Sequence, residues 1–498
     1  MQRAATQFRP DWSAAQLVPI GCALGSAGLT LVLCRGIDQA GAALLLMMLL
    51  GVVALLHPRA AVLAAFGYLA VMGDLRRLVL PEVRTSAWDP MILIGPAVAV
   101  LLAATALYSG ALRANSTISR LMLVLMALMT AQVFNPSQGG IAVGVAGALF
   151  YLVPMLWFWV GQWLGSEAFL EQLFRRLVIP CAAVASALGI YQAFFGLLPY
   201  QERWVQLAGY ASLYLAAGLV RPFSFFTSSA EFGHYVSVAT ALVVAGVFFR
   251  RVGLAAILAP LMVMAVFLQG SRSIFVTIPA AAAVLWSVQG RSVSAWGSRL
   301  IFAGGGCVLV LIVLLAALPA SGSGSRVAPI LQHQVGGLLN PLDPQRSSAR
   351  VHGEMVIEGI TGSISSPLGH GLGATTMAAT KFGGRGGSTE LDISNLFVSL
   401  GLPGGLLYVA LVITVLRRAA LYWRRSGGWV ALCVLGMLVA ELGNWLIGGH
   451  YAVVALLWFC IGALDRLSGA EVAAEPPAAE SPQGMSRSLR PALATARA

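Results

Sequence analysis

The chain contains fourteen long apolar stretches, and two extended polar segments lie between successive stretches. Hydrophobic residues make up 58% of the 498 residues and charged residues only 10%. A soluble protein of this size cannot bury so much apolar surface, so the composition indicates a bilayer protein. Backbone groups in lipid must pair within their own segment, which favours helices of about 20 apolar residues. We therefore predict an all-α, polytopic membrane protein with about 14 transmembrane helices.

Basic residues in the short connections predict the orientation. Arginines gather in five of these connections, and the positive-inside rule places all five in the cytoplasm together with both termini. The two polar segments, 196–233 and 320–392, then face outward. We expect one membrane domain over 1–468 and a disordered tail over 469–498, because the tail is poor in apolar residues. The expected spans lie near 14–34, 40–56, 60–73, 91–108, 121–135, 141–163, 177–195, 234–249, 253–269, 273–288, 300–319, 393–416, 429–447 and 451–464.

Several classes of chemistry lack their sequence patterns. The six cysteines form no CxxC pair, so neither zinc nor a disulfide framework is indicated. No paired-aspartate metal motif and no Walker-type phosphate loop occurs, which argues against a metal, a cofactor or ATP as an energy source. The net charge of +12 is explained by cytoplasmic arginines that face anionic membrane lipid, and nucleic acid is not an expected partner. An enzyme of this kind needs a substrate that arrives already activated.

Three outward arginine positions are candidates for anion binding. Arg76 and Arg77 either bind anionic headgroups or a diphosphate, or pair with nearby carboxylates, and the pairing is the favoured alternative. Arg221 precedes a proline and a helix start at Ser228, where exposed backbone amides favour an anion. Capping explains the serines of this segment, but it does not explain Arg221. Arg272 lies at the outer end of an apolar helix, where it either has a function or reaches the headgroups.

The second polar segment predicts an amphipathic helix. Ser347 or Ser348 can cap it, and it runs to about residue 360. Four charged side chains share one stripe at i, i+4 spacing, which suits either a ligand or a solvated ladder of ion pairs. The stripe consists of Arg346, Arg350, Glu354 and Glu358.

Candidate bases follow this helix. His370 lies in a glycine-rich turn and can be a base, a ligand or only a turn residue. Ser388 or Thr389 can cap the next helix, with Glu390 and Asp392 in its first turn. The helix dipole stabilises carboxylates there, and the same position suits a general base at the membrane surface.

Four motifs in order carry a resemblance to a known family. They are RPFSFFTSSAEFGHY, GSRSIF, RxxxEMVIEGITGSISSPLGHGLG, and an acidic motif ahead of GLPGG. Together they resemble the O-antigen ligase and polymerase superfamily of bacterial envelope glycan enzymes, over roughly 221–405. The resemblance implies a metal-independent glycosyltransferase at the outer face of the bacterial inner membrane. Its donor would be an undecaprenyl-diphosphate-linked glycan, and its acceptor a hydroxyl of a glycan or lipid.

The resemblance also implies residue roles. Arg221, Arg272 and Arg350 match positions that hold the diphosphate in the family, and the family's acceptor-activating histidine falls on Glu390. This departure favours a polymerase, which would make exopolysaccharide or O-antigen, over a ligase acting on lipid A-core. Asp392, His352 and His370 are alternative bases. A flippase is an alternative from another class, and a peptidoglycan polymerase matches the motifs less well. Other envelope glycan assembly proteins are possible partners.

Overall fold

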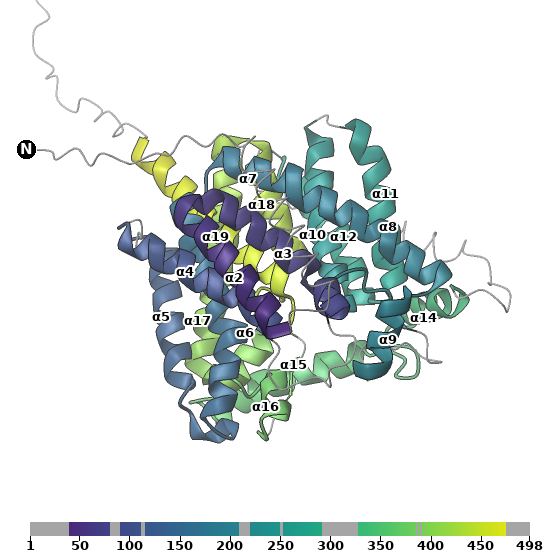
Figure 1. Ribbon diagram of the computed structural model, residues 1–498, viewed down its shortest axis with the longest axis horizontal. Coiled ribbons are helices and arrows are strands. Elements are labelled where there is room, and N and C mark those ends of the chain that lie inside the picture. Colours follow the sequence, from purple (N-terminus) through teal and green to yellow (C-terminus); the bar gives the residue numbers. More distant parts are fainter. Residues whose placement is uncertain are drawn as a thin grey trace, which may run out of the picture.

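The computed structural model describes residues 39–79, 90–110, 115–208, 220–249, 252–290, 327–384, 387–388 and 391–474. Helices are the regular elements of this described part, as the composition predicts (Figure 1). Within it, seven helical stretches are long and apolar enough to cross a membrane, and five further apolar helices are shorter. The described part is therefore all-helical, and the length and composition of its helices are those of a membrane protein.

The long stretches form the body of the bundle. They are α3 (Pro58–Val79), η1 with α4 (Pro90–Leu93, Ile94–Tyr108), α6 (Ile141–Leu164), α7 with η3 and α8 (Glu167–Leu173, Phe174–Val178, Ile179–Phe195), α10 (Ser229–Phe248), α17 (Asp392–Ser426) and α19 (Tyr451–Ala474). The shorter apolar helices are α2 (Gln39–Leu56), α5 (Thr117–Gln132), α11 (Val252–Gln269), α12 (Arg272–Ser287) and α18 (Trp429–Ala440).

Four helices of low apolarity lie in the two polar segments. They are α9 (Pro199–Ala208), α14 (Ala328–Leu339), α15 (Ala349–Ser365) and α16 (Met377–Lys381), and a short turn, η2 (Pro136–Gln138), precedes α6. Helix α15 packs on α17, and α14 packs on α11 and α12. In Figure 1 these four helices gather at one end of the bundle, which we call the α15 end.

Small residues let the central helices approach closely. Helices α6 and α19 pack face to face, and α10 and α19 are among the most buried, with 83% of their most apolar stretch inside the protein. A side chain on Gly161 of α6 would collide with the backbone of Phe459, and one on Gly462 of α19 would collide with that of Phe158. Glycines at such contacts are typical of helix packing in membranes, where close approach replaces the hydrophobic effect.

Twelve of the predicted spans fall within the described residues, and each coincides with an apolar helix. The spans predicted at 14–34 and 300–319 lie outside the described residues. The span predicted at 60–73 is longer than expected, because α3 has 22 residues. Helix α19 continues to Ala474, past the predicted start of the tail, and the rest of the tail lies outside the described residues.

Two helix ends differ from the prediction. The span expected at 429–447 ends at Ala440, and a turn-rich segment over 441–450 follows. Gly443 and Gly449 in this segment have φ of 95° and 94°, a left-handed conformation that favours glycine. Helix α17 is longer than predicted and kinks at Gly401, where φ is 72°. The kink allows the backbone of Pro367 to approach Gly401 too closely for any side chain there.

Candidate functional site

Arg272 joins three segments at the α15 end. It is the first residue of α12, and its guanidinium Nη1 donates to the carbonyl oxygens of His333 at 3.2 Å and Arg346 at 2.6 Å. The guanidinium lies directly on Gly337 of α14, so that a methyl group at Gly337 would overlap Nη1. The alternative of an arginine that only reaches the headgroups does not account for these contacts.

Residues 221–228, before α10, form the turn of Arg221, and residues 270–272, between α11 and α12, form the turn of Arg272. A buried chain of hydrogen bonds connects these two turns. Ser229 donates through Oγ to the carbonyl oxygen of Pro222 at 2.7 Å. Gln269 donates through Nε2 to the carbonyl oxygen and the Oγ of Ser229 at 3.0 and 3.1 Å. Its Oε1 accepts from the backbone N–H of Ser271 at 2.8 Å. The residues that adjoin the two arginines are thus joined through two side chains.

The pKa of His333 is affected by both arginines. Burial lowers the pKa of its imidazole, and the positive charges of Arg272 and Arg221 lower it further. Arg272 also binds the backbone carbonyl of His333, and the hydrogen bonds of Ser229 and Gln269 join the turn of Arg221 to that of Arg272. We call Arg221, Arg272, His333, Arg346 and Arg350 the arginine site.

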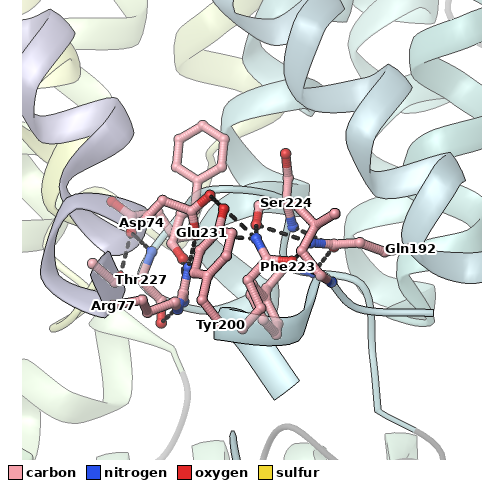
Figure 2. A network of polar contacts seen from close by, with 11 residues as sticks. Asp74, Arg77, Gln192, Tyr200, Phe223, Ser224, Thr227 and Glu231 are labelled. Carbon is pink, nitrogen blue, oxygen red and sulfur yellow. Dashed lines mark hydrogen bonds and ion pairs between the residues drawn. The ribbon is translucent and has the colours of Figure 1, made fainter. Parts of the chain in front are cut away.

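Figure 2 shows the polar network beneath the turn of Arg221. Gln192 of α8 accepts at Oε1 from the backbone N–H groups of Phe223 at 3.0 Å and Ser224 at 2.7 Å. Its Nε2 donates to the carbonyl oxygen of Ser224 at 3.1 Å and to Oε1 of Gln201 at 2.9 Å. Gln201 donates to the same carbonyl and to Asp74. The turn is therefore fixed from inside the protein.

Arg77 is a second support of the same turn. Its guanidinium pairs with Asp74 at 2.8 Å and donates to the carbonyl oxygen of Phe226 at 2.6 Å. It also lies against the rings of Trp204 and Phe223, at 4.5 and 4.2 Å from their centroids. The side chain of Arg77 is 1% exposed, which leaves no surface for a substrate. Arg77 therefore pairs with a nearby carboxylate, as the favoured alternative predicted, and does not bind a headgroup or diphosphate. Arg76 lies beside Arg77 in the last turn of α3.

The start of α10 already holds an anion of its own. Ser228 accepts at Oγ from the backbone N–H of Glu231, as the capping alternative predicts. The buried carboxylate of Glu231 accepts from the N–H and hydroxyl of Thr227 and from the N–H of Ala452. Of the amides that we expected to attract a phosphate, that of Glu231 is thus occupied by Ser228, and the buried Glu231 carboxylate lies at the same helix start.

Helix α15 presents the exposed part of the arginine site. Ser347 accepts at Oγ from the N–H of Ala349, which identifies Ser347 and not Ser348 as the capping side chain. Arg350 pairs with Glu354 at 2.8 Å, and both side chains are more than half exposed. Arg346 precedes the helix and pairs with Asp343 at 3.4 Å, so it is not part of the i, i+4 stripe.

His370 lies at the other end of α15. Its turn is bound to the kinked start of α17, with the N–H of His370 donating to Val398 at 2.9 Å and that of Gly371 to Ser399 at 3.1 Å. The imidazole is exposed. Arg350 and Ser365 are separated by fifteen helical residues, which span about 22 Å at 1.5 Å per residue. The structure therefore does not bring His370 to the arginine site. His352 is half-buried on α15, two residues beyond Arg350.

Of the two carboxylates in the predicted base region, the structure describes Asp392. Asp392 is fully buried, and its Oδ2 accepts from the hydroxyl of Tyr408 at 2.9 Å and the N–H of Leu446 at 2.7 Å. These bonds hold the 441–450 segment onto α17, and they leave Asp392 inaccessible to a substrate. Glu390 and Thr389 lie outside the described residues. Ser394, near the start of α17, packs against Gly359 of α15.

The sequence did not predict one cluster of buried ionisable side chains. His234 of α10 pairs through Nδ1 with Oε2 of Glu441 at 2.8 Å, and the His450 ring lies 4.7 Å from that of His234. All three residues are buried. The cluster joins α10 to the 441–450 segment, across more than 200 residues of sequence. A single glutamate or histidine at a helix end gives no local signal for such a partner.

Among the described residues, no group of three or more histidines, cysteines or carboxylates is arranged to hold a metal ion. No protein-family model matches the chain, and no curated protein matches it.

Proposed function

We propose that the protein is a glycan polymerase of the O-antigen ligase and polymerase type. It joins oligosaccharide repeat units that are carried on undecaprenyl diphosphate, and its product is exopolysaccharide or O-antigen. It acts at the outer face of the bacterial inner membrane, with about fourteen spans and both termini in the cytoplasm. No metal takes part in this proposal.

One observation carries the proposal. Arg221 and Arg272 come from segments that lie about fifty residues apart, yet the buried hydrogen bonds of Ser229 and Gln269 join their turns, and Arg272 also binds the backbone at Arg346. Guanidinium groups bind phosphate oxygens in bidentate geometry, and several of them can stabilise a leaving diphosphate. Arg221 and Arg272 belong to two of the four motifs that carry the resemblance, and Arg350 opens a third.

The chemistry is a displacement at the anomeric carbon of the donor sugar. The acceptor hydroxyl oxygen forms the new bond to this carbon, while the bond from the carbon to the diphosphate oxygen breaks. The electron pair of the broken bond leaves with undecaprenyl diphosphate, whose charge the arginine site stabilises. The hydroxyl proton passes to a base, for which Glu390 is our candidate. Arg350 supplies a further, solvent-exposed charge near the diphosphate.

A strain that lacks the protein tests this proposal. Its lipid-linked intermediates and its surface glycan are analysed together. Single repeat units on the carrier, with no long chains, would support the polymerase. Long chains that remain on the carrier, with none on the final acceptor, would support the ligase instead. Unchanged surface glycan and unchanged intermediates would exclude both.

A lipid-linked glycan flippase is the candidate from another class. The buried pair of His234 and Glu441 favours it, because ionisable groups inside a membrane domain often mark a transport or proton pathway. In the same strain, a flippase defect would leave repeat units inaccessible to a glycosidase added outside the cell. A polymerase defect would leave them accessible.

A further inference from the structure

Two buried glutamines lie where apolar helices end beneath the arginine site. Gln192 is near the end of α8 and is 5% exposed, and Gln269 is the last residue of α11 and is fully buried. A buried amide side chain is tolerated only when its donors and its acceptor find partners. Both glutamines find theirs in the turns that carry Arg221 and Arg272.

Gln192 binds the turn at a strained residue. Among the described residues, Ser224 is the only non-glycine residue with positive φ, at 53°. Residues other than glycine adopt this region at a cost, and such strain persists where the surroundings over-determine it. Here the N–H of Phe223 and both backbone polar groups of Ser224 are bound by the one side chain of Gln192. Gln192 thus holds the backbone three residues after Arg221.

Gln269 fixes the distance between the two turns. Through Ser229 it reaches the carbonyl of Pro222, and through its own Oε1 it holds the N–H of Ser271. Pro222 adjoins Arg221, and Ser271 adjoins Arg272. Neither glutamine belongs to the arginine site itself, so each acts only through the backbone that it binds.

We infer that Gln192 and Gln269 are positioning residues that hold Arg221 and Arg272 in a fixed relation before a ligand binds. The arginine site is thereby preorganised for a diphosphate, and no closure of the turn is needed. Preorganisation of this kind raises affinity because the ordering cost is met during folding. The identification of the ligand as a diphosphate rests on the proposed function, whereas the rigidity of the turn does not depend on it.

Hydrogen exchange of the purified protein measures the rigidity directly. In Gln192→Leu, the amides of Phe223 and Ser224 lose their shared acceptor, and we expect them to exchange roughly tenfold faster. In Gln269→Leu, the amide of Ser271 should respond by a similar factor. Gln192→Glu keeps the oxygen that accepts both amides, and it serves as the second variant if Gln192→Leu does not fold.

Gln162→Leu is the matched control. Gln162 is a buried amide of α6 that donates to Ser119 and Asp465, away from the turns of Arg221 and Arg272. It should lower thermal stability without changing exchange over 221–231. If all three glutamine variants alter that segment equally, the inference is wrong, because the effect is then a general loss of stability.

Strain at Ser224 gives a rescue experiment. Glycine adopts positive φ without cost, so Ser224→Gly should restore part of the stability lost in the Gln192→Leu background, although it supplies no acceptor for the two amides. Ser224→Ala keeps the strain and should restore none of it. Lack of any difference between the glycine and alanine variants would overturn the role of Gln192.

Binding of undecaprenyl diphosphate in detergent micelles is the second measurement. We expect Gln192→Leu and Gln269→Leu to bind roughly tenfold more weakly than wild type, since a smaller fraction of the protein is competent. Wild-type affinity in both variants, with faster exchange, would overturn preorganisation of the site. If wild type itself does not bind, the proposed function fails, and unchanged exchange in the variants would then overturn the positioning roles separately.

Discussion

The turn of Arg221 and helix α15 both bring arginines to the α15 end, but the protein holds them in opposite ways. The turn is bound from inside by Arg77, Gln192 and Gln269, all of which are buried. Helix α15 instead carries Arg350 on its exposed surface, paired with Glu354 one turn along the helix. Buried charges that lose a partner cost several kcal/mol, whereas exposed pairs contribute little. Arg77 therefore supports the fold, whereas Arg350 is available to a ligand.

Removal of one arginine from each region is the strongest test of this difference. Arg77→Leu leaves Asp74 without its partner and frees the carbonyls of Phe226 and Thr227, and we expect a loss of about 3–5 kcal/mol in the free energy of unfolding. Arg350→Leu should leave stability unchanged. Thermal and denaturant unfolding in detergent measure both. Equal effects of the two substitutions would contradict the division between the regions.

Two neighbouring glycines of α14 separate the function of Arg272 from stability. Gly337→Ala places a methyl group where the Arg272 guanidinium lies, and the flexible side chain must move away. Gly336→Ala meets open space and is the matched control. Alanine favours a helix over glycine by about 1 kcal/mol, so neither variant should be less stable. We expect polymer yield to fall by roughly tenfold or more in Gly337→Ala alone.

The sequence predicted the elements better than it predicted their contacts. Apolar length and composition located twelve helices, because the bilayer imposes a local rule on each span. Capping at Ser228 and the carboxylate in the first turn of α17 followed from equally local chemistry. The end of α18 at Ala440 was missed, since glycines after it turn the chain while apolar residues continue.

Long-range polar contacts were not predictable in this way. Gln192 and Gln269 occur in apolar helices, and nothing nearby in the sequence reveals that their partners are Ser224 and Ser229. The pair of His234 and Glu441 is hidden for the same reason. The motifs did point to Arg221 and Arg272, because an arginine near a span end is costly and thus conspicuous.

Substitutions in the exposed pair of helix α15 should have a smaller effect, and this effect is on donor binding. Arg350→Ala removes a charge that water screens, and we expect donor binding to weaken by roughly threefold, and less at high salt. Glu354→Ala releases Arg350 from its pair and should strengthen binding slightly. Titrations at two salt concentrations distinguish the variants. A total loss of binding in Arg350→Ala would mean that this guanidinium is not merely an exposed contributor.

The smallest effect is a pH dependence from His333. Its pKa in the folded protein is below the ordinary value of 6.5, so the unfolded chain takes up a proton first as the pH falls. Stability from this residue is full above pH 6.5 and declines as the pH drops through that value. His333→Gln should flatten the decline. A bound diphosphate would offset the two arginines and raise the pKa of His333, so donor affinity should increase as the pH falls, in wild type only.

The most direct test uses the purified protein with undecaprenyl-diphosphate-linked repeat units in detergent or proteoliposomes, and compares wild type with Arg272→Ala. We expect wild type to lengthen the lipid-linked glycan and to release undecaprenyl diphosphate, in equal numbers of bonds formed and carriers freed. Arg272→Ala, folded as judged by its unfolding curve, should do neither. Chain extension that persists in Arg272→Ala, or a wild-type protein that folds and binds the donor without extending it, would contradict a polymerase built around the arginine site.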